Sequence, residues 1–401
     1  MYNVENPKES KEIQKSPKES KGIQKRWFNM AVKQANPFTP TFGKIPLQIA
    51  GRQTLIKDVL DGLENNPGDP NRSTIFIGAR GTGKTVLLTK IVEEASVNGW
   101  ICVNVNANAD MLDDILIQIK DIASEVLSQK SLSYISSITI GGAGITLSER
   151  QQNIRTTWRS EMTSIIKELN CKNVGLLISV DEIDVKVEEL RLLITTYQHF
   201  VREHRDVALI MAGLPSKVIN LLRDDSISFL RRAFQHYLEP IDETEVRYSI
   251  RRTIELAERE IEDDALEVAT VNAKGFPFMI QLIGYHIWRQ NPDNYIISLK
   301  DANEGILLAN KDIEKMIYGS TFRDLSEKDI AFLVAMLCDD NYSKISDIAQ
   351  RMGVTPKYAG EYRRRLIAHG LISSTGRGKI TYDLPMLKEY LTSHIAQEID
   401  K

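Results

Sequence analysis

The segment GARGTGKT (Gly78–Thr85) has the residue types and spacing that hold a nucleotide phosphate. It fits the pattern G-x-x-x-x-G-K-[ST], whose glycines let successive backbone N–H groups point at one anion. In this pattern the lysine, here Lys84, reaches the terminal phosphates, and the next hydroxyl, here Thr85, binds Mg²⁺. A flexible turn without a ligand would need neither side chain. We therefore expect nucleotide contacts from Gly78, Ala79, Arg80, Gly81, Thr82, Gly83, Lys84, Thr85 and Val86.

A second candidate site element is the acidic pair that follows the apolar run VGLLISVDEID (Val174–Asp184). In a parallel sheet the carboxyl ends of the strands meet at the ligand edge, so Asp181 and Glu182 should lie beside the glycine loop, at the tip of a neighbouring strand. Asp181 would hold the metal, directly or through water, and Glu182 would orient and polarise the attacking water. Two solvated acids at a strand end are the alternative, but the paired acids favour hydrolysis over binding alone.

The elements that must position these residues alternate between strand and helix patterns. Apolar strands are expected within 73–78, 100–107, 174–184 and 207–213, with helices following the glycine loop and over 111–127. This alternation predicts an α/β fold, with a parallel P-loop NTPase sheet and helices on both of its faces.

The composition is that of an ordinary globular chain. It has 401 residues, 42% hydrophobic and 26% charged, with a formal net charge of −3, so any surface for nucleic acid must be local. The three cysteines lie far apart beside apolar residues, which predicts buried free thiols in a reducing cytoplasm. The histidines form no cluster with metal-ligand spacing, so we expect no metal beyond Mg²⁺. No apolar run is long enough to suggest a membrane partner.

Two segments carry weaker signals. Residues 1–30 contain the repeat KESKEIQK/KESKGIQK and are predicted to be a disordered low-complexity tail, with a basic arm as the weaker alternative. The segment Ser137–Leu147 alternates like a small hairpin, and a simple connector is favoured over a contact loop.

The order of glycine loop, acidic strand end, further strand, RR segment, helical lid and small C-terminal domain resembles the AAA+ ATPases over roughly residues 45–390. It is most similar to the branch with the replication-initiator (origin-recognition) ATPases and the archaeal-type and STAND ATPases. The resemblance implies a core at 45–241, a helical lid at 242–320 and a winged-helix domain at 326–395. It also implies ATP and Mg²⁺ as cofactors.

The resemblance assigns further residues. IAGRQTLI matches the box that lines the adenine pocket, which places Gly51 and Arg52 near the base. The lid sequence GFPF resembles the GxP lid, in which the proline, here Pro277, packs near the base. Arg231 and Arg232 lie where these proteins carry an arginine that reaches a neighbouring subunit's γ-phosphate; surface arginines are the alternative. The strand that relatives end with a polar sensor ends here in Gly213.

The C-terminal sequence has helix-turn-helix spacing, with helices at 345–352 and from Pro356, followed by a segment that alternates like a two-stranded wing. Residues 357–379 hold six basic residues and one acid, a net charge of +5. We therefore expect contacts with duplex DNA phosphates. The candidate DNA-binding residues are Lys357, Arg364, Arg365, Arg377 and Lys379.

Three functional hypotheses follow. The first is an ATP-hydrolysing AAA+ switch that acts on DNA and forms a homo-oligomer in its ATP state. The second is a STAND-like signalling or defence ATPase whose winged helix docks protein. The third is a nucleotide-binding scaffold with negligible turnover, which Glu182 disfavours. The end of the chain at Lys401, without a repeat region, favours the first over the second.

Overall fold

The computed structural model describes residues 35–41, 43–128, 147–315, 322, 325–340, 342–376, 378–383 and 387–392. For residues 147–157 and 375–376 it describes the backbone alone. The expected N-terminal tail, Arg377 and nearly all of the Ser137–Leu147 segment lie outside the described residues.

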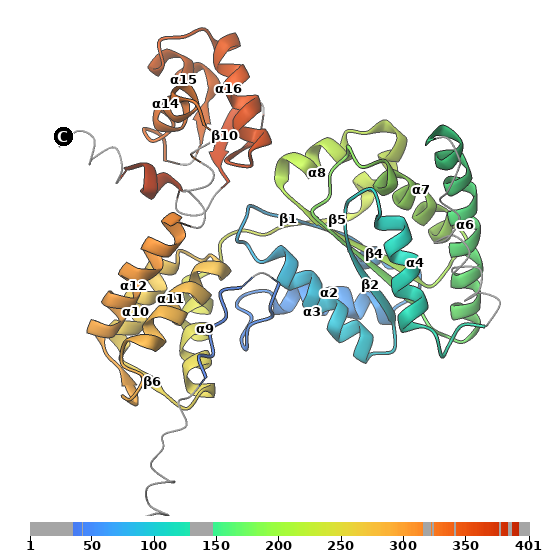
Figure 1. The fold of residues 1–401 in the computed structure, drawn as a ribbon, viewed down its shortest axis with the longest axis horizontal. Coiled ribbons are helices and arrows are strands. Elements are labelled where there is room, and N and C mark those ends of the chain that lie inside the picture. Colours follow the sequence, from blue (N-terminus) through green and yellow to red (C-terminus); the bar gives the residue numbers. More distant parts are fainter. Residues whose placement is uncertain are drawn as a thin grey trace, which may run out of the picture.

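Five parallel strands form the central sheet, in the order β2-β3-β4-β1-β5 (Figure 1). They are β1 (Ser73–Ile77), β2 (Ile101–Asn106), β3 (Leu176–Asp181), β4 (Val207–Gly213) and β5 (Phe234–Tyr237). The predicted parallel α/β fold is therefore confirmed. One detail of the prediction was wrong: β4 lies between β1 and β3, so the acidic strand is not the immediate neighbour of the glycine-loop strand.

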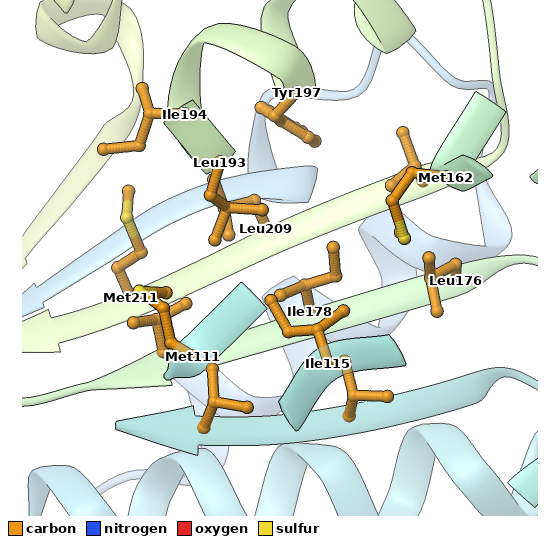
Figure 2. Close-up of a cluster of buried hydrophobic side chains, with 14 of the residues drawn as sticks. Met111, Ile115, Met162, Leu176, Ile178, Leu193, Ile194, Tyr197, Leu209 and Met211 are labelled. Carbon is orange, nitrogen blue, oxygen red and sulfur yellow. The ribbon is translucent and has the colours of Figure 1, made fainter. Parts of the chain in front are cut away.

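Helices cover both faces of the sheet, each above its own apolar core. On one face lie α4 (Met111–Ile122), α6 (Leu147–Cys171) and α7 (Glu188–Arg202), and Figure 2 shows side chains from α4 and α7 meeting those of β3 and β4. On the other face lie α2 (Gln53–Glu64) and α3 (Lys84–Val97). Strands β3 and β4 are buried along their whole length, which explains their uninterrupted apolar sequence.

A separate group of helices follows β5 and has its own core. It contains α9 (Glu243–Leu256), α10 (Asp263–Ala273), α11 (Pro277–Gln290) and α12 (Leu299–Ile313). We call this group the lid helices. The sequence predicted helix throughout, but the two-residue strands β6 (Glu260–Ile261) and β7 (Ile296–Ile297) also pair here. Phe38, from the segment before the core, is 1% exposed and completes this apolar cluster.

The C-terminal unit, described over most of residues 326–392, contains helices and a small sheet, and its last described residues, 387–392, are also helical. Its elements are α14 (Glu327–Ala335), β8 (Ser343–Lys344), α15 (Ile345–Arg351), α16 (Pro356–Ala368), β9 (Ile372–Gly376) and β10 (Lys379–Tyr382), with strand order β8-β10-β9. Ser326 and Asp329 form a capping box, and the Thr355 side chain caps α16. In Figure 1 this orange and red unit lies beside α8 (Pro215–Leu222), which β9 contacts.

Two general expectations are tested here. Cys102 is buried, but Cys171 and Cys338 are exposed, so the prediction of buried thiols was wrong for those two. The nearby apolar residues Leu169 and Met336 are buried, whereas the two thiols point toward solvent. In the part of the chain that the structure describes, no helix combines the length and the apolar character needed to cross a bilayer.

The seat of Phe38 gives a test of the lid packing. A Cβ at Gly284 would lie 2.3 Å from the Phe38 ring, inside contact distance. We expect Gly284→Ala to destabilise the lid by about 1–3 kcal/mol, because the ring has to be pushed out of a close-packed core. Thermal unfolding should show a lowered transition, whereas Val271→Ala, at a half-exposed position of the same helix group, should leave it nearly unchanged. Equal transitions for both variants would contradict this packing.

Candidate nucleotide-binding site

The glycine loop connects the carboxyl end of β1 to the first turn of α3. Gly81 and Gly83 have φ of +80° and +87°, in the left-handed region that favours glycine. The helix begins at Lys84, so the free N–H groups of its first turn face the same space as the loop amides. Backbone donors and a helix N-terminus together form an anion site.

Lys84 is the cation of this loop and is 6% exposed. Its Nζ donates hydrogen bonds to the carbonyl oxygens of Gly78 (3.0 Å) and Ala79 (2.9 Å). Burial lowers the pKa of Lys84, and the nearby carboxylates of Glu182 and Asp181 oppose that shift. The ammonium group is thus held inside the loop, where a phosphate would be its counter-ion.

The two predicted acids lie at the end of β3, and the first of them meets the loop directly. The Thr85 hydroxyl donates a hydrogen bond to Asp181 Oδ2 at 2.5 Å, and Asp181 itself is 5% exposed. The backbone N–H of Glu182 donates to Asp181 Oδ1 at 2.8 Å. Glu182 has a φ of +53°, which ends the strand and turns its exposed side chain toward the cavity next to the loop.

The Thr85 and Asp181 side chains fit a Mg²⁺ ion. Both present oxygen atoms, the ligand class that Mg²⁺ prefers, and Mg²⁺ characteristically combines one or two protein ligands with phosphate oxygens and water. Their contact at 2.5 Å brings both oxygens to one point beside the phosphate loop.

A cavity of about 710 Å³ opens beside the loop and is of the size expected for a nucleotide-sized ligand. Its walls are the glycine loop, the segment 39–50, and the start of lid helix α11. All of the loop residues from Arg80 to Val86 line it, as do Arg52, Glu182 and Pro277. The cavity therefore brings together most of the residues that the sequence assigned to a nucleotide.

Gly51 and Arg52, which were predicted to lie near the nucleotide base, are held by contacts with the segment that precedes the lid. Gly51 has a φ of +59°, and a Cβ there would lie 2.9 Å from Ile241. Arg52 Nη2 donates to the carbonyl oxygen of Glu239 at 2.7 Å, and burial lowers the pKa of Arg52. Of this pair, Arg52 lines the cavity, whereas Gly51 shapes the turn behind it.

Pro277 is the first residue of α11 and joins the lid to the phosphate loop. A Cβ at Gly83 would lie 3.3 Å from Pro277 Cγ, so the two residues are in close contact. Proline suits the first turn of a helix because it needs no hydrogen-bond acceptor for its nitrogen.

The segment 39–50 was missed as part of the site because its prolines and glycine read as a connection between elements. It supplies Lys44 and Gln48 to the cavity wall. Gln281 of the lid accepts a hydrogen bond from the Thr39 N–H at 3.0 Å, which fixes the segment to α11. The sequence signal for this part of the site was weak. It consisted of Lys44 and Gln48 in a short proline-containing segment before the α/β core.

The two arginines of the RR segment differ in their contacts. Arg231 donates through Nε to the carbonyl oxygen of Leu222 at 2.8 Å and pairs with Asp225 at 3.3 Å. Arg232 is exposed and has no side-chain hydrogen bond or ion pair with the residues that the structure describes. Arg232 is thus the one available to a neighbouring molecule.

Gly213 ends β4, where relatives carry a polar sensor. A Cβ at this position would lie 2.6 Å from Ile183 Cγ1, so the strand end has no room for a larger residue. Its carbonyl oxygen accepts from the N–H of Gly78 at 3.3 Å, so Gly213 supports the first residue of the glycine loop.

The predicted DNA contacts are on two elements of the C-terminal unit. Lys357 and Arg364 are exposed on α16, and Lys379 on β10 is exposed with its Nζ 4.0 Å from the centre of the Tyr342 ring. Arg365 instead pairs with Asp329 of α14 at 2.7 Å, a contact that joins the two helices. Sequence analysis missed Lys344, which lies opposite Lys379 in the β8–β10 pair.

Comparison with known proteins identifies one matching family model and several solved structures with a similar fold. A family model described as "Domain of unknown function (DUF8462)" matches residues 315–391. No curated protein matches the sequence. The chain is similar to the solved Walker-type ATPase PABY2304 of Pyrococcus abyssi, with 16% identity, a TM-score of 0.61, and coverage of 86% of this chain and 96% of that one.

Weaker structural similarity links the chain to two further archaeal proteins. Cdc6p of Pyrobaculum aerophilum matches with 15% identity and a TM-score of 0.46 over 90% of this chain and 97% of that one. The Orc1 protein of Aeropyrum pernix, solved in complex with DNA, matches with 15% identity and a TM-score of 0.43 over 87% and 94%.

The match to the Pyrococcus abyssi protein agrees with the predicted parallel α/β architecture. The predicted P-loop α/β fold is thereby confirmed: the chain has the fold of the solved Walker-type ATPase.

Proposed function

We propose that the chain binds ATP with Mg²⁺ at the glycine loop and hydrolyses it. The observation that carries the proposal is the meeting of Thr85 and Asp181 at 2.5 Å, with buried Lys84 and exposed Glu182 beside the same cavity. The proposed nucleotide ligands are the loop residues Gly78 to Val86 together with Gly51, Arg52 and Pro277.

In this mechanism the residues position charge rather than form covalent bonds. The loop amides and Lys84 bind the terminal phosphates, and Thr85 and Asp181 would hold Mg²⁺, which neutralises charge that develops on the phosphate oxygens. Glu182 orients a water molecule and accepts its proton as the oxygen attacks the γ-phosphorus. The bond from that phosphorus to the bridging oxygen breaks, and ADP leaves with the electron pair. The fixed strand end keeps this carboxylate beside the cavity.

We further propose a division into a tail (1–30), an ATPase core (45–241), a lid (242–320) and a winged-helix domain (326–395). The support is that the sheet, the lid helices and the C-terminal unit bury separate apolar clusters. Nucleotide-dependent changes in the core would then reorient the C-terminal unit, as in a molecular switch.

We propose duplex DNA as the partner of the C-terminal unit. Lys357 and Arg364 lie exposed on α16, which follows a helix-turn-helix arrangement with α15, and Lys379 adds a cation from the hairpin. Arg365 pairs with Asp329, but its side chain is still 52% exposed, so we propose it as a further phosphate contact that also holds α16 in place. The wing residue Arg377 is proposed on charge alone.

A STAND-like ATPase whose winged helix docks protein is the second candidate. The contact between Pro277 and Gly83 favours it, because it puts the proline of a GxP lid against the phosphate loop. The two candidates differ in whether the C-terminal unit has affinity for DNA.

The hydrolysis proposal is tested by Glu182→Gln. We expect ATP turnover to fall about 10²–10⁴-fold, because the water loses its proton acceptor, while ATP affinity is retained. Phosphate release and titration with a fluorescent ATP analogue measure the two effects. Lys84→Ala should lose affinity, and Glu93→Gln, an exposed acid on α3, should resemble the wild type. Wild-type turnover in Glu182→Gln would disprove the assigned role.

We also propose that the chain forms a homo-oligomer in its ATP state, and the two arginines test this. We expect Arg232→Ala to reduce turnover by more than about 100-fold if its guanidinium completes a neighbour's site. Arg231→Ala should cost much less, because Arg231 is bound within its own subunit. Mixing Arg232→Ala with Lys84→Ala subunits should restore part of the turnover, since each supplies what the other lacks. No recovery on mixing would argue against action between subunits.

The DNA proposal is tested by affinity against salt concentration. Wild-type binding should weaken steeply as salt rises, and replacing both Lys357 and Arg364 by alanine should reduce the slope of log K against log salt by about 2. Lys300→Ala, an exposed lysine of the lid, serves as the control. Undetectable DNA binding even at low salt would favour the protein-docking candidate.

A further inference from the structure

The segment 39–50, which forms one wall of the nucleotide cavity, is held by contacts with both the lid and α3. Near its start, the Thr39 N–H donates to Gln281 Oε1 of lid helix α11 at 3.0 Å. Further along, a Cβ at Gly43 would lie 3.8 Å from Thr85 Cγ2. The backbone of the segment therefore passes from the lid to the first turn of α3, where the phosphate loop ends.

Lys44 comes directly after this contact with α3. Its side chain is exposed and lines the cavity. It makes no hydrogen bond or ion pair with the residues that the structure describes. Thr85 lines the same cavity and would hold the Mg²⁺ that accompanies the phosphates, so a cation beside Thr85 lies close to the phosphate chain. The long, flexible stem of a lysine lets its ammonium group approach a ligand without movement of the backbone.

Lys44 differs from the other cations that line the cavity, because each of those already contacts another part of the protein. Lys84 donates to loop carbonyl oxygens, Arg52 donates to a carbonyl oxygen before the lid, and the Arg80 guanidinium lies against the C-terminal unit. Glu182 is the one acid among the described residues that line this cavity. Positive charge therefore predominates along the wall, which suits a polyanionic ligand.

We propose that Lys44 is a phosphate-binding residue of the nucleotide site, whose ammonium group contacts the phosphate chain from the wall formed by the segment 39–50. This inference rests on the ATP site proposed above. A hydrogen bond between a lysine and a phosphate oxygen is charge-assisted, and such bonds are stronger than those between neutral groups. The contacts of the segment with the lid and α3 hold the backbone of Lys44 in place before the ligand binds, which limits the conformational entropy lost on binding.

A contact with phosphate determines which ligands depend on Lys44. ATP and ADP both carry charged phosphates, whereas adenosine presents only the base and the sugar. Lys44 therefore strengthens the binding of the two nucleotides and leaves the binding of the nucleoside unchanged. A merely structural role in the segment would affect all three ligands alike, because the same wall of the cavity would be disturbed for each.

The test compares Lys44→Gln and Lys44→Arg with Lys57→Gln, which removes an exposed lysine of α2 outside the described lining of this cavity. Calorimetry on the full chain measures the affinities for adenosine, for Mg²⁺–ADP and for a non-hydrolysable Mg²⁺–ATP analogue. We expect Lys44→Gln to weaken binding of both nucleotides about tenfold and to change adenosine binding less than about twofold. Lys44→Arg keeps the charge, so its nucleotide affinities should stay within about threefold of the wild type.

Two results of this comparison would overturn the proposal. The first is nucleotide affinity in Lys44→Gln that equals the wild type or falls no further than its affinity for adenosine. The second is an equal loss of nucleotide affinity in Lys57→Gln, which would show a general effect of charge rather than a contact.

A second measurement uses the wild-type chain, so it does not depend on the folding of a variant. An amine-acylating reagent is applied with and without saturating ligand, and mass spectrometry measures the modification of each lysine. The ATP analogue and ADP should protect Lys44, adenosine should not, and Lys57 should react equally in all samples. An unprotected Lys44 with both nucleotides bound would overturn the inference while leaving nucleotide binding intact. Failure of the wild type to bind either nucleotide would instead remove the proposed function, and the inference with it.

Discussion

The parallel direction of the five central strands is the constraint on which the site depends. Because all five run the same way, their carboxyl ends, and the groups that follow them, meet at one edge. The loop after β1 and the acids after β3 can therefore meet although β4 lies between their strands. The hydrogen bond from Thr85 to Asp181 spans this gap, since Thr85 is on the first turn of α3 rather than on a strand. A change in the length of β3 would move Asp181 away from the loop.

The lid is held to this edge by packing rather than by charge. Phe38 fills the lid core while the residues that follow it line the cavity, so one segment fixes both. Gln281 secures the segment through the Thr39 N–H, and Pro277 contacts Gly83. A nucleotide in the cavity would touch core, segment and lid together. Movement of the core, the segment or the lid would then change the contacts that the nucleotide makes with the other two. Such coupling between a ligand and the positions of the parts around it is the physical requirement for a switch.

The sequence predicted the structure best where the residue types of one short segment are enough to determine its structure or its ligand. The glycine loop and the DE pair could be identified because their residue types suit a single kind of ligand, and the alternating apolar runs predicted the parallel sheet. The strand order could not be read from such patterns, because it depends on how helices pack across the sheet. The role of Phe38 also escaped prediction, since it depends on contacts between segments more than 200 residues apart in the chain. Nor could sequence separate Arg231 from Arg232, which differ only in their partners.

Charged side chains of the phosphate loop connect the nucleotide site with the C-terminal unit. Lys84 and Arg80 are the loop cations, and Asp181 and Glu182 are acids that a Mg²⁺ ion and a reacting water would need in any case. Arg80 also belongs to a second contact, because its guanidinium lies against the turn at Gly370 in the C-terminal unit. The same side chain lines the cavity beside the loop. A ligand that changes the position of Arg80 would therefore change the contact between the loop and the C-terminal unit as well.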